Sequence, residues 1–341
     1  MGRQTEQNTK AVGAELAAVL PDIKPWYKEP HLLRLNLYII SIMMCASANG
    51  YDGSMMNGLL ALPQWHSFMK QPTGAWLGFI NAAYSLGNVL AYPLAAWVCN
   101  KHGRKTGIYI SWCCLALGSG LQTGAPNDAA FVAARFIIGC ASGFFLSAPL
   151  LIAENAILRT EELSKPSGMW YAGAVVAAWT TYATRNLDAW SWRMPSLLQI
   201  ALPILSAPGL FLIGESPRWL VSMDRVEEAR AVIANHHANG DTRSPLVNFE
   251  MMEIEETIRA EKEAHSSTTW ADLLKTPGNR HRLFISCGVG VISYYLAMVL
   301  SSVGITSVDD QTLISACIQI WNLFCATGAA VIVSTLSRSD I

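Results

Sequence analysis

The chain has 341 residues, of which 52% are hydrophobic and 14% are charged, and its mean hydropathy is +0.28. Because soluble domains carry about 25% charged residues, this composition predicts a membrane protein. The formal net charge of -1, without a dense basic run outside short connections, gives no sign of a nucleic-acid partner. The eight cysteines lie in or beside apolar segments, which argues against a disulfide framework or a metal site. No cofactor is expected.

Apolar segments of near-transmembrane length recur along the chain, at residues 33–57, 75–98, 106–124, 129–152, 168–185, 196–214, 283–303 and 311–336. A helix satisfies its own backbone hydrogen bonds in lipid, so we expect an all-α, multi-pass membrane protein with about eight spans. The link between spans two and three contains Lys101, Arg104 and Lys105, whereas the preceding link contains Lys70. The positive-inside rule therefore places the former link, the N-terminus and the link after span six in the cytoplasm.

The first span, from Leu35 to Gly58, carries one carboxylate, Asp52, in its last third. An ionisable side chain inside a span costs a few kcal/mol and usually faces a partner or a water-filled cavity. Asp52 is therefore a candidate site residue. Alternatively, the span ends near Asn49 and Asp52 is an interfacial turn residue.

The fourth span presents Arg135, Gly139 and Gly143 on one helical face. The glycines permit close approach of another backbone, and the arginine requires a counter-charge or a route to water. Few acids are available at membrane depth, so we expect Arg135 to pair with Asp52.

Two other spans carry stripes of neutral polar residues at helical spacing: Asn81, Ser85, Asn88 and Tyr92 in the second, and Ser315, Gln319 and Asn322 in the eighth. Such stripes are expected to face the protein interior. They suit a hydroxyl-rich ligand in a cavity, and they equally suit contacts between helices.

The segment from Glu215 to Arg282 is rich in charges of both signs and is expected to be a cytoplasmic linker. Ser216 and Pro217 form a helix start signal, a capping residue followed by proline at the first helical position. The apolar residues that follow indicate an amphipathic helix, and a second polar helix is expected around Met251 to Ala264. The apolar residues are Trp219, Leu220, Val226, Ala229 and Val232.

Six short motifs, in this order, resemble the sugar porter family of the major facilitator superfamily, in its fungal hexose and lactose permease-like branch. The motifs are Gly50-Tyr51-Asp52-Gly53, Gly103-Arg104-Lys105, Arg135 to Gly139, Pro149 to Glu154, Trp192-Arg193-Met194-Pro195, and Glu215 to Leu220. Asn100 and Leu151 stand where the family commonly has an aspartate and a tyrosine. Each motif alone is weak, but their order makes the resemblance specific.

The resemblance implies a major facilitator fold of twelve helices in two halves, with alternating access to a central sugar site. It divides the chain into a cytoplasmic tail at 1–32, a six-helix bundle at 33–214, a helical linker at 215–282 and the first two helices of an incomplete second bundle at 283–341. The expected function is transport of a hexose or disaccharide, by proton symport, across the plasma membrane. Uniport is the alternative mechanism, because a single buried acid permits proton coupling without requiring it. Sugar, proton and membrane lipid are the expected partners.

The resemblance also implies roles for individual residues. Asp52 would take up and release the proton, and Arg135 would tune that exchange. Substrate contacts are expected from Asn81, Asn88, Tyr294, Tyr295, Gln319 and Asn322. A cytoplasmic gate is expected from Gly103, Arg104, Lys105, Glu154, Glu215 and Arg218, with ion pairs among Arg104, Glu154, Glu215 and Arg218.

Three departures from the family pattern shape these expectations. The chain stops at Ile341 after the eighth span, the family's glutamines before Gly288 are missing, and residues 157–166 replace an arginine-glycine turn. We expect an incomplete chain, from mis-assigned exons or a truncated copy, that is non-functional by itself. A sugar sensor that binds without transport, with 215–282 as its output segment, is the alternative. The sequence contains no paired aspartates in facing spans, and no metal-ligand cluster or nucleophile-base spacing, that would support an enzyme.

Overall fold

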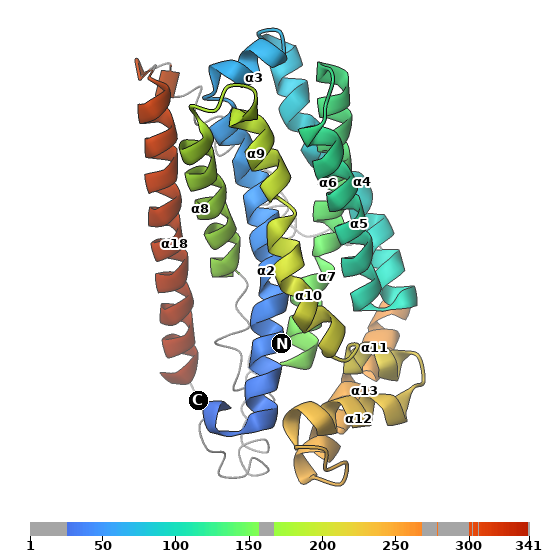
Figure 1. Ribbon diagram of the computed structural model, residues 1–341. Coiled ribbons are helices and arrows are strands. Elements are labelled where there is room, and N and C mark those ends of the chain that lie inside the picture. The colour runs from blue at the N-terminus through green and yellow to red at the C-terminus, as the bar shows by residue number, and fades with distance from the viewer. Residues whose placement is uncertain are drawn as a thin grey trace.

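The structure is a computed structural model that describes residues 26–156, 167–267, 278, 300–301, 303–305 and 307–339. The regular elements in these ranges are helices (Figure 1). They are η1 (Trp26–Lys28), α2 (Pro30–Leu59), α3 (Pro63–Phe68), α4 (Gly74–His102), α5 (Arg104–Thr123), α6 (Asp128–Phe145), α7 (Ser147–Asn155), α8 (Ser167–Thr184), α9 (Trp190–Leu198), α10 (Ala201–Leu212), α11 (Pro217–Ser222), α12 (Val226–His237), α13 (Pro245–Ser267) and α18 (Val308–Ser339).

The helices from α2 to α10 form a bundle that corresponds to the first six expected spans. Helices α6 and α7 share the fourth span, and α9 and α10 share the sixth. Helix α9 contains Pro195, and α10 contains Pro203 and Pro208. Proline removes a helical N–H and clashes with the preceding turn, which accounts for the interruption between α9 and α10.

By length and composition, three segments of the described chain are long and apolar enough to cross a membrane: Pro30–Leu59, Asp128–Asn155 and Trp190–Leu212. Helix α4 has 29 residues, but Asn81 and Asn88 lower its hydropathy. The bundle nevertheless exposes large apolar side chains, and a lipid environment accounts for that exposure. They include Leu86, Val89, Leu90, Ile204 and Phe211.

Glycines set two close helix contacts in the bundle. A Cβ atom added at Gly173 of α8 would lie 1.7 Å from the backbone oxygen of Ser47 in α2. One added at Gly139 of α6 would lie 2.0 Å from the backbone oxygen of Tyr84 in α4. Helices α2 and α8, and likewise α4 and α6, therefore touch backbone to backbone, as small residues allow in membrane bundles.

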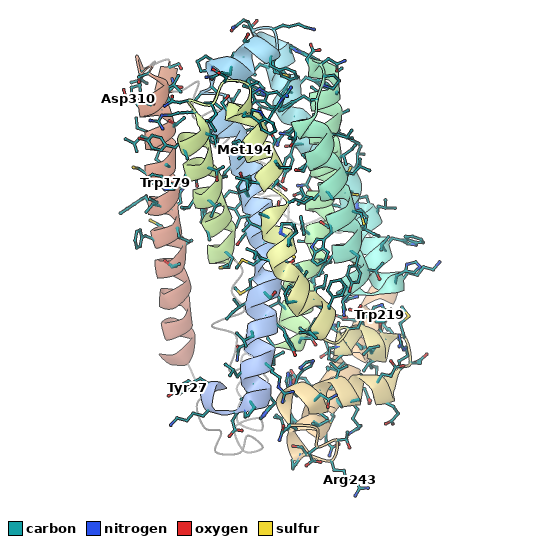
Figure 2. The ribbon with its side chains drawn as sticks, viewed as in Figure 1. Tyr27, Trp179, Met194, Trp219, Arg243 and Asp310 are labelled. Carbon is teal, nitrogen blue, oxygen red and sulfur yellow. The ribbon has the colours of Figure 1, made fainter. Side chains whose placement is uncertain are left out.

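The described part of the linker forms helices α11, α12 and α13, which pack together at one end of the bundle, here called the linker end. The expected single amphipathic helix after Pro217 is instead two helices, because the chain turns between Ser222 and Val226, where Asp224 has a φ of 59°. Figure 2 shows Arg243 at the tip of the linker and Asp310 at the opposite end of the molecule.

Helix α18 contains the eighth expected span and packs against α8. An ion pair between Arg185, just after α8, and Asp309, in the first turn of α18, joins the two elements at the end opposite the linker. The seventh expected span, 283–303, lies almost entirely outside the described residues.

Candidate functional site

Asp52 lies inside the continuous helix α2 and is fully buried. This helix runs on to Leu59, which contradicts the alternative that the span ends near Asn49 and leaves Asp52 in an interfacial turn. Neither carboxylate oxygen of Asp52 accepts a hydrogen bond from a residue that the structure describes. A buried carboxylate in this condition is costly, which marks the position as a candidate site.

Arg135 of α6 acts on Asp52 from the bundle interior. Its side chain is also buried, at 1% exposure, and its charge interacts electrostatically with the Asp52 carboxyl group. The guanidinium carbon lies 4.9 Å from the centre of the Tyr84 ring of α4. Helices α2, α4 and α6 therefore meet around this pair of opposite charges.

Hydrogen bonds connect the same helices about one turn away. The side-chain oxygen of Asn49 in α2 accepts bonds from the Tyr84 hydroxyl, at 3.1 Å, and from the Ser142 hydroxyl of α6, at 2.7 Å. The Asn88 amide of α4 donates to Ser142 at 3.3 Å. Asn88 thus makes a contact between helices, and Asn49 and Ser142 are members of the cluster that were not expected as site residues.

The other expected substrate residues lie on separate elements. Asn81 of α4 is 8% exposed, and both polar atoms of its amide lack a hydrogen-bond partner among the described residues. Gln319 of α18 is buried, and the Asn322 amide lies 3.5 Å from its side-chain oxygen. Helix α18 packs mainly against α8, whereas α4 packs mainly against α6. Tyr294 and Tyr295 lie outside the described residues.

The polar stripe of α4 faces the interior only in part. Asn81 is buried and Asn88 is half-buried, but Ser85 and Tyr92 are exposed. The expectation that the whole stripe turns inward is therefore wrong for these last two residues.

Arg104 and Glu154 form a two-bond ion pair at the linker end. The Arg104 Nε and Nη2 atoms lie 2.9 Å from the two carboxylate oxygens of Glu154, and both side chains are largely buried. A third guanidinium bond reaches the backbone oxygen of Cys99. This pair ties the start of α5 to the end of α7.

Glu215 binds the first turn of α5. Its carboxylate accepts the backbone N–H groups of Arg104 at 3.1 Å and Lys105 at 3.2 Å. The preceding Gly103 has a φ of 98° and no side chain to cap the helix, so Glu215 satisfies N–H groups that lack an intrahelical partner. Burial raises the pKa of Glu215, opposed by these backbone hydrogen bonds and by Lys105.

Arg218 does not join the other charged residues of the expected gate. It pairs with Glu261 of α13, so the expected ion pairing of Arg218 with the gate acids is wrong. Glu261 lies 43 residues along the chain from Arg218. Only the folding of α13 over α11 brings the two together, and no local sequence signal indicates the pair.

A cavity of about 440 Å³ opens among α7, α11, α12 and α13. On one side of it, the His237 ring nitrogens lie 2.6 Å from a Glu250 carboxylate oxygen and 3.1 Å from the Asn155 backbone oxygen. The cavity is lined by residues of α7 and the linker and not by Asp52 or Arg135. No cluster of three or more His, Cys, Asp or Glu side chains suited to a metal ion occurs in the described part of the chain.

The comparisons with known proteins agree on one family. The family described as "Sugar (and other) transporter" matches residues 38–341. The high-affinity glucose transporter of Kluyveromyces lactis is 26% identical over 339 residues, which cover 93% of this chain and 59% of that protein. The MFS glucose transporter mfs1 of Aspergillus flavus is 27% identical over 277 residues, covering 75% of this chain and 52% of that protein.

Solved structures show the same architecture. The proton:xylose symporter XylE bound to 6-bromo-6-deoxy-D-glucose superposes with a TM-score of 0.70 at 20% identity, covering 87% of this chain and 68% of that one. The inward open conformation of XylE from E. coli gives a TM-score of 0.65, also at 20% identity, over 88% of this chain and 68% of that one. At this identity the likeness establishes the fold alone. The chain spans 59% and 52% of the lengths of the two fungal relatives.

Proposed function

Because this chain belongs to the sugar transporter family of the major facilitator superfamily, we propose that the protein containing it carries a sugar across the membrane together with a proton. Membership confirms the expected multi-pass membrane class and the helical major facilitator fold, and it favours a transporter over an enzyme. The proposal adds the substrate class, a hexose or disaccharide, the coupling ion and the plasma membrane as its location.

The buried residues Asp52 and Arg135, here called the coupling pair, support the proposal. Asp52 is fully buried, and its oxygens accept no hydrogen bond from the described residues, so a proton is a simple means of neutralising it. Arg135, from another helix, acts on it electrostatically. A rearrangement that changes the separation of the two side chains changes the proton affinity of the carboxylate, which couples helix movement to proton uptake and release.

The linker end supplies the proposed gate. Positive-inside counting assigns it to the cytoplasm. There Arg104 pairs with Glu154, and Glu215 holds the start of α5. Opening this end requires these contacts to break, since they join α5 to α7 and to the segment after α10. Gly103 and Lys105 belong to the same contact, and the Lys105 ammonium also donates to the backbone oxygen that follows α10, at 2.9 Å.

The experiment expresses the full gene product containing this sequence in a host without hexose transporters. Uptake of labelled hexose is measured with and without an imposed inward proton gradient. We expect uptake to rise with the gradient, and Asp52→Asn to remove that response because the amide cannot take up the proton. Gradient-independent uptake by the wild-type protein would contradict proton coupling.

The matched control is Asp188→Asn, which removes an acid from the exposed loop after α8 and leaves the coupling pair intact. It should retain the wild-type gradient response. Saturable sugar binding without any flux would instead favour a membrane sensor, with the packed helices α11 to α13 as the output segment.

A further inference from the structure

Tyr84 of α4 contacts Arg135 of α6 and Asn49 of α2, the helix that also carries Asp52. We infer that Tyr84 is a positioning residue, which fixes Arg135 relative to Asp52 through its ring and fixes α2 through its hydroxyl. This inference rests on the proposed proton coupling and adds a third helix to it. Helix α4 then sets the distance across which the arginine acts on the carboxylate.

The ring contact is direct and shielded from solvent. The Arg135 guanidinium lies 4.9 Å from the Tyr84 ring centre, and the two side chains are 1% and 3% exposed. A guanidinium over an aromatic face is attracted by the ring's negative charge distribution, and the attraction is stronger when water is excluded. The ring therefore limits where the Arg135 guanidinium can lie.

The hydroxyl contact reaches the helix that carries the acid. The Tyr84 hydroxyl donates to the Asn49 side chain at 3.1 Å. Asn49 precedes Asp52 by three residues in α2, so the two side chains share a helical face. Ser142 of α6 donates to the same Asn49 oxygen at 2.7 Å, which closes the connection from α4 through α2 to α6.

The backbone fixes the position of Tyr84 itself. Gly139 lies one turn after Arg135, and a Cβ atom placed there would come within 2.0 Å of the Tyr84 backbone oxygen. Helix α4 is thus in backbone contact with α6 at this level.

Within the described part of the chain, the charged group that acts on the Asp52 carboxyl is Arg135 of α6. Tyr51, next to Asp52 on α2, is a titratable neighbour, and its hydroxyl donates to the Pro195 backbone oxygen of α9. Since Asp52 accepts no hydrogen bond from the described residues, its interaction with Arg135 depends on where the guanidinium is held.

The test measures sugar uptake by the full gene product against external pH. Tyr84→Leu removes the ring and hydroxyl. We expect the pH midpoint of uptake to move upward by about one unit, because the anionic form of Asp52 loses part of the cation that stabilises it. Tyr84→Phe retains the ring, so it should keep the midpoint near the wild-type value while losing the bond to Asn49.

A second series protects the test against misfolding of Tyr84→Leu. In the Tyr84→Phe protein, the ring at this position is fluorinated by incorporation of phenylalanine analogues with one, two and three fluorines, which weaken the negative face of the ring with little change in shape. The midpoint should rise stepwise with fluorine number. Tyr182→Leu is the matched control, because it removes a ring whose centre lies 4.0 Å from the Arg185 guanidinium, away from the coupling pair.

The outcomes separate the two proposals. A wild-type protein whose uptake is independent of pH overturns the proton coupling, and this inference with it. A wild-type protein with pH-dependent uptake, whose midpoint is unchanged in Tyr84→Leu and across the fluorinated series, overturns the positioning role of Tyr84 alone. A pH midpoint that rises stepwise across the fluorinated series, while Tyr182→Leu keeps the wild-type midpoint, supports it.

Discussion

His236 lies in α12 at the junction between the linker and the first helix of the bundle. Its ring meets the Tyr38 ring of α2 edge to face, with the ring centres 6.4 Å apart. Burial lowers the pKa of His236 from 6.5 to about 4, and the neighbouring His237 adds to this effect. The neutral imidazole is therefore the form that fits the folded protein.

This burial predicts a loss of stability on acidification. The unfolded chain binds a proton at His236 below about pH 6.5, whereas the folded chain binds it only near pH 4, so the stabilisation is complete above pH 6.5 and is lost as pH falls toward 4. Between about pH 7 and pH 5 this group should remove about 2 kcal/mol from the free energy of unfolding. His236→Phe keeps an aromatic edge against Tyr38 and should reduce the acid sensitivity by that amount. The measurement is thermal unfolding in detergent at both pH values, and equal acid sensitivity in the two proteins would contradict the assignment.

At the scale of elements, the sequence predicts the positions of the bundle helices well. The span expected at 106–124 corresponds to α5, and the span expected at 75–98 lies within α4. Two local features of the sequence indicate these helices and the break between them: their apolar composition and the glycine at position 103, which adopts a positive φ. The turn at Asp224 that separates α11 from α12 is a helix C-cap, in which the N–H groups of Asp224 and Arg225 donate to the backbone oxygens of Val221 and Leu220. Glycine is the usual residue at a position with positive φ, so aspartate gives a weaker sequence signal there than Gly103 does.

The candidate site is less predictable than the helices. Asp52 and Arg135 are recognisable because charges are rare inside spans. Other residues that lie near the coupling pair or join helices of the linker give no such signal when taken one at a time. They are Asn49, Ser142 and Glu261. They gain their roles from contacts between elements distant in sequence, such as Ser142 with Asn49, and such contacts exist only once the helices have packed.

The contact between α4 and α6 gives a prediction at this scale. Gly139→Ala places a methyl group against the Tyr84 backbone oxygen, which cannot move without separating the helices. We expect it to lower the free energy of unfolding by about 1–3 kcal/mol. Gly120→Ala is the control, because its Cβ in α5 meets no atom within 4 Å, and there the better helix propensity of alanine should leave stability equal or higher by up to about 1 kcal/mol. Unfolding in detergent measures both, and equal effects would contradict backbone contact at Gly139.

At the scale of the whole molecule, the polar contacts lie at different levels along the bundle. Arg185 and Asp309 join α8 to α18 at the end opposite the linker. The coupling pair lies in the interior, buried from solvent and enclosed by packed helices. The ion pair of Arg104 and Glu154, which belongs to the proposed gate, lies at the linker end. The proposed alternating access requires the two ends to open in turn around the interior level.

The ion pair at the linker end gives the prediction that tests this arrangement. Arg104 and Glu154 are 13% and 12% exposed, so Arg104→Ala leaves Glu154 buried without its partner and should cost about 3 kcal/mol in the closed state. The linker end should then open more often. Cys99 is buried beside this pair, with its backbone oxygen bound to Arg104, so its thiol reports the opening directly.

Labelling of Cys99 by a membrane-permeant maleimide, followed by peptide mass spectrometry, measures that opening. We expect labelling of Cys99 to accelerate at least about tenfold in Arg104→Ala, because about 1.4 kcal/mol already changes an equilibrium constant tenfold. Arg225→Ala is the control, since it breaks a solvent-exposed pair with Glu228 in α12 and should leave the labelling rate unchanged. Equal labelling of Cys99 in wild-type and Arg104→Ala protein would show that this ion pair does not hold the linker end closed, and the gate would then have to depend on Glu215 and its bonds to the start of α5.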